Sequence, residues 1–260
     1  MVRAASTLAL DWFRRPLLIE NKESDPGRYD PVTIADRAVE DALRAALQSR
    51  FPDHQVLGEE RGVSGPVEAR SAGTGPAATY RWVIDPIDGT RAFVTGQPQW
   101  GTLLGLQLGD RVLGGWLHQP TLGHTYVAAG ATAALFEGDR STPLRTSEQT
   151  VLADAVLLCT HPDLFDPGPD AAAFRRVQDA VRMSRFSGDC LNYGYLATGY
   201  ADLVIEANLQ PYDIIPLIPL IERAGGVITD RQGRLPLAGG WAVAAATPEL
   251  HAAALDLLNR

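Results

Sequence analysis

The stretch that most constrains this chain is Trp82–Arg91, which reads Trp-Val-Ile-Asp-Pro-Ile-Asp-Gly-Thr-Arg. Tyr80–Ile84 is β-branched and aromatic and is bounded by polar residues, which predicts a buried strand. Asp85 then stands at the end of that strand, where open sheets place ligand-binding groups. Pro86 fixes φ and has no N–H to donate, so we expect the chain to turn there.

Two carboxylates three residues apart, Asp85 and Asp88, are followed at once by Gly89-Thr90. Like charges this close repel each other unless a cation neutralises them. Gly89-Thr90 is typical of a helix entry, where free N–H groups and the helix dipole favour an anion. The motif therefore predicts a divalent metal held by Asp85 and Asp88 and facing a phosphate at Gly89-Thr90.

The rest of the sequence is that of an ordinary globular protein. Of its 260 residues 45% are hydrophobic and 21% charged, enough for one large domain or two modest ones with a sizeable core. The net charge of −8 and the lack of a basic patch argue against nucleic-acid binding. Two distant cysteines, Cys159 and Cys190, suit a reducing compartment, and Met1–Glu20 is neither a convincing signal nor a membrane segment. We expect a cytoplasmic protein that does not enter the membrane.

Hydrophobic periodicity and turn signals predict an α/β protein with an N-terminal half, 1–150, and a C-terminal half, 151–260. The expected helices are one within Met1–Glu20, one opened by Thr33 and ended by Pro52, and those over 170–181, 190–198, 213–224 and 248–258. The expected strands are 55–57, 80–84, 101–108, 111–118, 125–129, 133–136, 155–159, 203–206 and 241–245. Gly62–Thr79 is rich in Gly, Ala, Ser and Pro, which indicates a flexible loop and a candidate lid.

Three further acidic residues fall at the ends of predicted elements. Asp36 has the position of a helix-start charge that forms a capping box with Thr33. Glu59 is expected to be an exposed turn residue, and Asp213 the N-cap of the helix behind it. Taken singly, none of the three predicts a site.

Four segments, in this order, resemble the signature segments of the inositol monophosphatase superfamily. They are Asp30-Pro31-Val32-Thr33-Ile34-Ala35-Asp36, Gly58-Glu59-Glu60, Asp85-Pro86-Ile87-Asp88-Gly89-Thr90, and Tyr212-Asp213 ahead of Glu222-Arg223-Ala224-Gly225-Gly226. The match runs from about Asp30 to Gly233, and four motifs in order are far more specific than any one of them. The resemblance implies alternating α/β/α/β/α layers and a magnesium-dependent phosphomonoesterase that acts on a small-molecule substrate.

The resemblance also implies roles for single residues. The metal ligands would be Glu59, Asp85, the Ile87 carbonyl, Asp88 and Asp213, with Asp36 near a weaker additional metal. The phosphate would be held by Gly89, Thr90 and Asp88, and catalysis would use Glu59, Thr90 and Asp85 around a water molecule. Hard oxygen ligands are those that magnesium prefers, and two such ions could neutralise the phosphate and activate the water. The family further implies two or three Mg²⁺ ions per site, no phospho-enzyme, lithium inhibition and a homodimer.

Several segments depart from the inositol pattern and resemble the histidinol-phosphatase branch, whose substrate in histidine biosynthesis is L-histidinol phosphate. They are Arg91-Ala92-Phe93, Ser187-Gly188-Asp189-Cys190, Val204-Ile205-Glu206-Ala207 and Leu209-Gln210-Pro211-Tyr212-Asp213. Asp189 and Glu206 could pair with the ammonium and imidazole of that substrate, although they could also bind the hydroxyls of inositol. The alternatives are an inositol-1-monophosphatase or broad sugar-phosphate phosphatase and, in another class, a non-catalytic metal-dependent regulatory protein.

Three assignments carry a second interpretation. Asp189 could be only an N-cap, and Asn208 either lines the substrate pocket or is an ordinary loop residue. Arg91 either contacts the phosphate or substrate, or braces Asp85 or another carboxylate. Lys22 matches weakly a family lysine near the additional metal.

Overall fold

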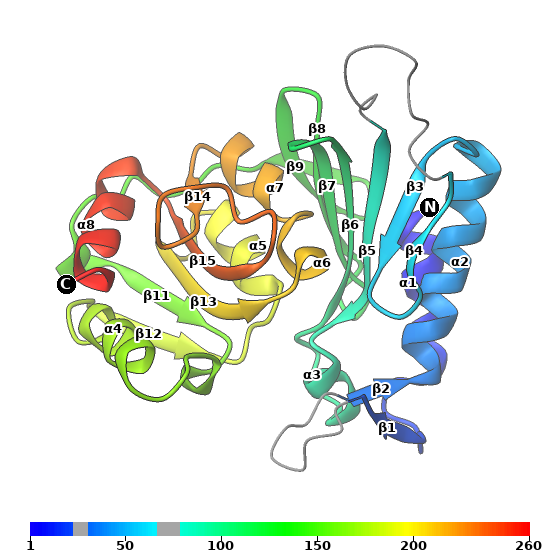
Figure 1. Ribbon diagram of the computed structural model, residues 1–260, viewed down its shortest axis with the longest axis horizontal. Helices are drawn as coiled ribbons and strands as arrows, with labels where there is room; N and C mark the ends of the chain where they lie inside the picture. The colour runs from blue at the N-terminus through cyan, green and yellow to red at the C-terminus, as the bar shows by residue number, and fades with distance from the viewer. Residues whose placement is uncertain (23–30, 67–78) are drawn as a thin grey trace.

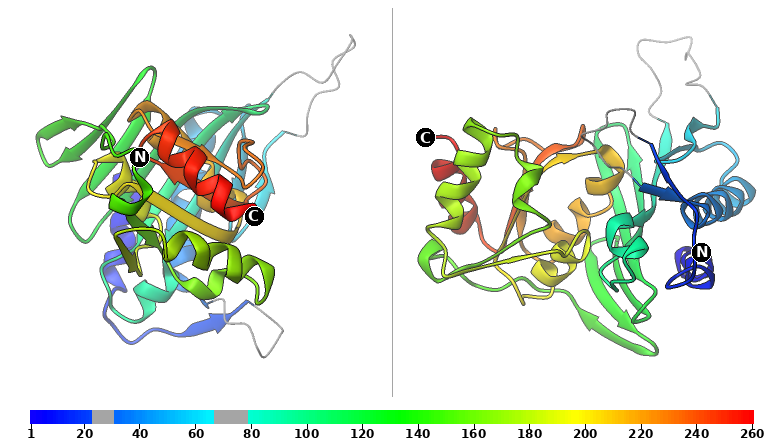
Figure 2. Two further views of the ribbon diagram at one scale, coloured as in Figure 1. Left: turned by 90° about the vertical axis from the view of Figure 1, so that its left-hand side faces the viewer. Right: turned by 90° about the horizontal axis from the view of Figure 1, so that it is seen from below.

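The computed structural model describes residues 1–22, 31–66 and 79–260 and stacks helices and sheets in alternating layers (Figure 1). In order across the molecule these are α1 (Val2–Thr7) with α2 (Ile34–Arg50), an eight-stranded sheet, α5 (Leu191–Ala197) with α6 (Pro211–Ile214) and α7 (Ile218–Arg223), a five-stranded sheet, and α4 (Pro169–Gln178) with α8 (Pro248–Leu258). Figure 2 shows α4 and α8 together on the outer face of the smaller sheet. The α/β/α/β/α order confirms the predicted fold class.

The larger sheet has the strand order β10-β9-β8-β7-β6-β5-β3-β4. Its strands are β3 (Gln55–Gly58), β4 (Gly62–Ser64), β5 (Tyr80–Asp88), β6 (Gly101–Leu108), β7 (Arg111–Gln119), β8 (His124–Ala129), β9 (Thr132–Glu137) and β10 (Arg140–Pro143). The run from β5 to β10 is an antiparallel meander that contains the predicted strands 80–84, 101–108, 111–118, 125–129 and 133–136, whereas β3 and β5 are parallel, with Gly58 opposite Ile84. Because parallel strands end at the same edge, the residues that follow β3 lie beside the end of β5.

The smaller sheet has the order β12-β11-β13-β15-β14. Its strands are β11 (Val156–Cys159), β12 (Met183–Phe186), β13 (Leu203–Leu209), β14 (Val227–Thr229) and β15 (Gly240–Ala245). β11 is parallel to β12 and β13, and β15 is antiparallel to β13 and β14. The two edge strands β12 and β14 were not predicted, because segments this short carry little periodicity.

Three groups of buried apolar side chains hold the layers together. One lies between α1–α2 and the larger sheet, one between the two sheets around α5 and α7, and one between the smaller sheet and α4–α8. The first includes Val39, Leu43 and Leu47, which recur at helical spacing along α2. Fully burying such a side chain stabilises the fold by about 1.5–3 kcal/mol. Each sheet therefore packs against a different group of apolar side chains on each of its two faces.

Strand β5 does not stop at Ile84, as the sequence predicts, but continues through Pro86 to Asp88. Its register against β6 shifts between Asp85, opposite Leu103, and Asp88, opposite Gly101. The strand therefore holds one extra residue there, and a proline without an N–H is tolerated at such a bulge. Residues three apart in a regular strand point to opposite faces, so the extra residue is what allows both aspartates to face the same side.

The predicted N-terminal helix is shorter than expected. Helix α1 passes into a 3₁₀ turn, Leu8–Asp11, and the chain then forms β1 (Ile19–Asn21), which pairs with β2 (Pro31–Thr33). Pro16 lies between them and cannot continue a helix, because it lacks an N–H donor. At the start of α2 the predicted capping box is confirmed: Thr33 accepts from the N–H of Ala35, and Asp36 accepts from the N–H of Thr33.

The predicted helix 213–224 is wrong, because the segment forms two helices, α6 and α7, with Pro216 between them. The break packs closely on β7: a Cβ on Gly115 would lie 1.9 Å from the Pro216 carbonyl oxygen. Part of the predicted 62–79 loop is also strand, since Gly62–Ser64 is β4. Residues 67–78 of the candidate lid, and Asp30 of the first motif, lie outside the described residues. In the described part of the chain, every helix is too short or too polar to cross a membrane.

Candidate metal and phosphate site

Three of the predicted ligands come together where the two sheets face each other. Asp85, Asp88 and Asp213 each place an oxygen atom within 4.8 Å of the others. The first two flank the bulge in β5, and Asp213 is on α6. Asp85 is only 2% exposed, and its Oδ1 has no hydrogen-bond partner among the described residues. A buried carboxylate oxygen that lacks a protein partner is suited to a metal ion.

The electrostatics of this cluster favour a cation. Burial raises the pKa of Asp85 well above its usual value, and the charges of Glu59, Asp88 and Asp213 raise it further. Burial and the charge of Asp213 do the same to the pKa of Asp88. Ionisation of neighbouring carboxyl groups in a buried site is unfavourable, because the charges repel each other. These carboxyl groups are therefore stable only when they are protonated or when a cation neutralises them. The donor set is all oxygen, which fits a hard divalent ion.

Backbone N–H groups orient two of the three carboxylates. Asp88 Oδ1 accepts from the N–H of Cys190 at 2.7 Å, which joins the end of β5 to the start of α5. Asp213 Oδ2 accepts from the N–H of Gln210 at 2.7 Å. Gln210 is the N-cap of α6 and Asp213 lies three residues later, so the prediction that Asp213 is the N-cap is wrong. In each case a backbone N–H fixes the orientation of one carboxylate oxygen.

Glu59 lies beside the cluster because β3 and β5 are parallel, and its N–H donates to the carbonyl of Ile84 at 3.2 Å. Burial raises its pKa to about 8, although the nearby Lys22 lowers it. Lys22 Nζ lies 2.6 Å from Glu59 Oε1 and 2.7 Å from Glu60 Oε1. Lys22, which matches weakly a family lysine near the additional metal, therefore lies between Glu59 and Glu60. An ammonium group already occupies part of the space around that carboxylate.

Asp36, Ile87 and Thr90 form a second group. The Thr90 hydroxyl lies 2.9 Å from the Ile87 carbonyl oxygen and 3.5 Å from Asp36 Oδ1. Burial raises the pKa of Asp36 to about 6, against the opposing hydrogen bonds from Thr33. The carboxylate of Asp36 therefore has two roles in the structure, as the cap of α2 and as a neighbour of Thr90.

Gly89 is the N-cap of α3 (Thr90–Val94) and has φ 89°, a conformation that L side chains rarely adopt. A Cβ there would lie 2.7 Å from the carbonyl oxygen of Gln99. The predicted helix entry is confirmed, but α3 has only 5 residues, so its dipole is small. An anion at Gly89-Thr90 would therefore be bound by the backbone N–H groups of these residues and only weakly by the helix dipole.

A second acidic group contains two of the predicted substrate residues, Asp189 and Glu206. Glu206 is 2% exposed, and its Oε1 accepts from the N–H of Thr160 (3.0 Å), the hydroxyl of Thr160 (2.6 Å) and the amide of Asn192 (3.2 Å). The same Thr160 hydroxyl accepts from the N–H of Asp189 at 3.0 Å. The charges of Asp189 and Glu206 both raise the pKa of Asp88, so this group adjoins the first.

Sequence reasoning missed Thr160 and Asn192. Thr160 directly follows strand β11, and this position at a strand end, like that expected for Asp85, is a signal that marks it. Asn192 lies within the first turn of α5, and no sequence signal marks it.

The N-cap of α5 is Cys190, without a side-chain hydrogen bond, so the alternative that Asp189 is only an N-cap is wrong. The φ of Asp189 is 47°, and burial and the charge of Glu206 raise its pKa to about 7 while Arg91 lowers it. The charge of Arg91 thus acts on a carboxylate, in line with the bracing alternative. Asn208 is exposed, and its amide donates to the carbonyl of Leu164 at 2.6 Å, so one of its donors is engaged in a loop contact.

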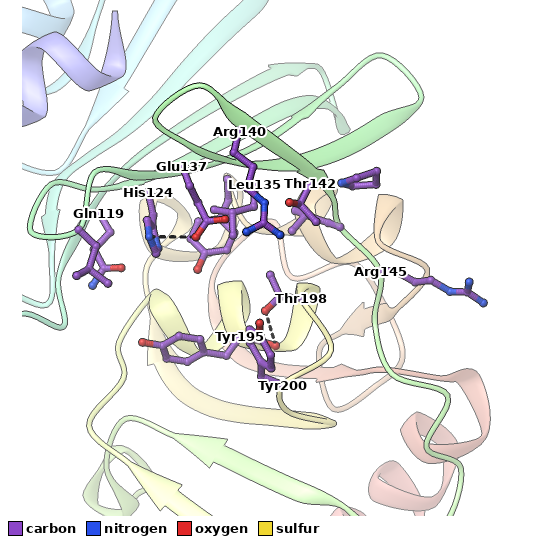
Figure 3. Close-up of a pocket in the computed structure, with 14 residues that line it drawn as sticks. Gln119, His124, Leu135, Glu137, Arg140, Thr142, Arg145, Tyr195, Thr198 and Tyr200 are labelled. Carbon is purple, nitrogen blue, oxygen red and sulfur yellow. Dashed lines mark hydrogen bonds and ion pairs between the residues drawn. The ribbon is translucent and has the colours of Figure 1, made fainter.

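Two cavities lie near α5, and neither is lined by the predicted metal ligands in the described part of the chain. One of about 380 Å³ lies between α5 and the β8–β10 hairpins, where His124 contacts Glu137 (Figure 3). The other, of about 420 Å³, is lined in part by Gln99, Gly188 and Asn192. It therefore adjoins the group around Glu206.

Comparison with known proteins identifies the class of protein to which this layered fold and its acidic cluster belong. The sequence model of the inositol monophosphatase family matches residues 1–260, and the chain belongs to this family. Enzymes of this family use divalent metal ions and hydrolyse phosphate esters of small molecules, and the cluster is consistent with both.

Individual relatives carry different names. The chain is 36% identical over 231 residues to the bifunctional phosphatase IMPL2, chloroplastic, of Arabidopsis thaliana, covering 89% of this chain but 62% of that protein. It thus spans less than two thirds of that relative's length. It is 33% identical to the histidinol-phosphatase of Streptomyces coelicolor, over 99% of this chain and 93% of that one. The solved structure of an inositol monophosphatase from Zymomonas mobilis has a TM-score of 0.81 at 32% identity, covering 98% and 93% of the two chains.

Proposed function

We propose that this chain is a Mg²⁺-dependent phosphatase that hydrolyses L-histidinol phosphate to L-histidinol and phosphate in histidine biosynthesis. The observation that carries the proposal is the second acidic group, Asp189 and Glu206, which Thr160 links and which adjoins Asp88. A phosphate site next to two carboxylates suits an ester whose alcohol part is cationic. Histidinol phosphate has that charge distribution, and inositol phosphate does not.

The proposal assigns cation binding to Asp85, Asp88, Asp213, Glu59 and the carbonyl of Ile87, with Asp36 near an additional ion. When bound, two or three Mg²⁺ ions would neutralise the phosphate and lower the pKa of a water molecule. Residues 1–150 would supply most ligands and 151–260 Asp213 and the substrate contacts, in a homodimer.

The chain's own groups then handle phosphate and water. The N–H groups of Gly89 and Thr90 donate to the phosphate oxygens, where the left-handed glycine leaves the backbone accessible. The Thr90 hydroxyl uses its hydrogen on Ile87 and keeps its lone pairs, so it can orient a water. Glu59, whose pKa is raised to about 8 without a cation, is the proton acceptor for that water.

Selection of the alcohol part falls to the second acidic group. Three hydrogen bonds fix Glu206 Oε1, so the carboxylate is oriented before substrate arrives. Asp189 pairs with the ammonium group, and the charge of Arg91 favours its ionised form by opposing the rise in its pKa that burial and Glu206 cause. We assign Asn208 to the edge of the region that binds the alcohol part of the substrate.

The test is phosphate release with Mg²⁺ from L-histidinol phosphate, inositol 1-phosphate and a set of sugar phosphates. We expect kcat/KM to be highest for L-histidinol phosphate, with no turnover after chelation or in Asp88→Asn. A preference for inositol 1-phosphate would support the second candidate, an inositol-1-monophosphatase, because carboxylates also accept from hydroxyls. Release from none of the esters would favour a non-catalytic role.

A further inference from the structure

Helix α2 carries a buried ion pair that has no part in the site as described so far. Arg44 Nε donates to Glu40 Oε1 at 2.7 Å, and the two residues are 7% and 0% exposed. A buried ion pair of this kind adds little net stability, because desolvation of both charges offsets their attraction. Its other contacts therefore indicate what it does.

Most of those contacts are with the turn that follows β3, and Arg44 also donates to the hydroxyl of Ser64 at 2.5 Å and to the carbonyl of Val56 at 3.5 Å. Glu40 Oε2 accepts from the N–H of Glu60 at 2.7 Å, and Oε1 accepts from the N–H of Arg61 at 3.1 Å. Arg44 donates to the carbonyl oxygen of Gly62 at 2.5 Å. The pair thus binds three successive residues of the turn through their backbone atoms, directly after Glu59.

The helix also packs against the residue before Glu59. A Cβ on Gly58 would lie 2.3 Å from Glu40 Oε1 and 2.8 Å from an Arg44 nitrogen. Gly58 does not have the left-handed conformation, so glycine is needed there for space and not for backbone freedom. The backbone is therefore held on both sides of Glu59.

The side chain of Glu59 is held less firmly than its backbone. Lys22 Nζ lies 2.6 Å from Glu59 Oε1, but a lysine side chain is flexible. The backbone bonds of the turn therefore set where Glu59 lies relative to Asp85 and Asp213. The hydrogen bonds to Glu40 hold the turn in place. They add no net charge near the site, because Arg44 neutralises Glu40.

We propose that the Glu40–Arg44 pair positions Glu59 for cation binding, by fixing the turn that carries it to the same helix that carries Asp36. The inference rests on the proposed function in one respect, that Glu59 is a metal ligand. Glu40 and Arg44 touch neither the cation nor the substrate, and they act only through Glu59.

The test compares Glu40→Gln with a matched control, Asp41→Asn. The amide of Gln keeps one acceptor oxygen, turns an NH₂ group toward N–H donors and leaves Arg44 without a counter-charge. Asp41 is the next residue on α2 and forms an exposed ion pair with Arg61 (2.9 Å), so Asp41→Asn breaks a link to the same turn without touching its backbone bonds. Mn²⁺ binding to the full chain, measured by calorimetry and by electron paramagnetic resonance, gives a readout independent of turnover.

We expect Glu40→Gln to weaken Mn²⁺ binding about tenfold, the size typical of residues that orient a metal ligand. With saturating metal its kcat should fall less than threefold, while the Mg²⁺ concentration for half-maximal activity rises about tenfold. Asp41→Asn should bind Mn²⁺ within twofold of the wild type. As a second variant, Gly58→Ala should weaken Mn²⁺ binding in the same direction, because its Cβ displaces Glu40.

The outcomes separate the two proposals. If the wild type binds no Mn²⁺, the metal site and the proposed function fail, and the inference fails with them. If the wild type binds Mn²⁺ and both variants bind it equally well, the positioning role is refuted and the proposed function stands. If both variants lose the native circular dichroism spectrum without metal, the pair is a stability element of the fold, which also overturns the inference.

Discussion

Replacing Asp85 by Asn should make the metal-free protein more stable while removing its response to metal. The substitution keeps the shape of the side chain and deletes one charge from a cluster whose oxygens lie within 4.8 Å of one another. The new amide can donate to the remaining carboxylates. Most substitutions of a fully buried residue destabilise, so the expected direction is unusual and informative.

The magnitude follows from the geometry. Two full charges 4.8 Å apart repel by about 3 kcal/mol at an effective dielectric constant of about 20. Because the raised pKa values of Asp85 and Asp88 let protons relieve part of this repulsion, we expect a net gain of about 1–2 kcal/mol. For a chain of this size the gain corresponds to a rise in Tm of about 2–6 °C.

The stability that Asp85→Asn gains over the metal-free wild type should depend on pH with a defined sign. Since the pKa of Asp85 is raised in the folded state, the metal-free protein loses stability as the pH rises above the unfolded value near 4. Asn does not titrate, so the Tm difference between variant and wild type should be small at pH 5 and large at pH 8. Calorimetric unfolding with a chelator and then with excess Mg²⁺ measures both parts. A lower Tm of the variant at pH 8 with chelator, or an unchanged Mg²⁺ response, would refute the reasoning.

Three other predictions concern the surroundings of the cluster. As Asp189 ionises around its pKa of about 7, the KM for L-histidinol phosphate should fall between pH 6 and pH 8 in the wild type but not in Asp189→Asn. Gly89→Ala should cost about 1–3 kcal/mol of stability, because it combines a left-handed φ with a 2.7 Å contact to the Gln99 carbonyl, and should lower Tm and activity together. Lys22→Met should lower the metal-free Tm and tighten Mn²⁺ binding about threefold, because an ammonium no longer competes for Glu59.

Each of these has a control or a contrary result. Asp189 has no role in substrate charge if the KM profiles of wild type and Asp189→Asn coincide. Gly123→Ala is the control for Gly89→Ala, since it has φ 69° with no described atom within 4 Å of its Cβ; an equal fall in Tm would leave the contact without effect. Weaker Mn²⁺ binding in Lys22→Met would mean that Lys22 supports the site and does not compete for it.

The sequence predicts the parts of the site that motifs mark and misses those that depend on local distortion or distant contacts. Asp85, Asp88 and Asp213 were expected together, and the structure brings them together. The bulge that turns the first two to one side was not predicted, because a proline after a strand equally suggests that the strand ends. Thr160 lies 46 residues from Glu206, a separation at which sequence periodicity says nothing about contact.

The helices too are predicted where local signals agree and missed where distant contacts decide. Helix α8 has its predicted bounds, Pro248–Leu258, because a capping Thr247 and a regular apolar face agree. The helix over 213–224 was expected to continue through Pro216, because the apolar spacing continues there, but the proline breaks it. How closely α6 and α7 approach β7 depends on Gly115, which is far away in the sequence.

The hydrogen bond from the Cys190 N–H to Asp88 spans 102 positions in the chain and joins the larger sheet to α5, which lies in the layer between the two sheets. The acidic cluster therefore forms only after most of the chain has been synthesised and the sheets have docked, late on any folding route that builds local structure first. A bound divalent ion would then stabilise an arrangement that the folding transition state lacks, and so would slow unfolding while leaving the folding rate nearly unchanged. Metal supply would thus govern how long the folded enzyme persists, as well as how fast it turns over.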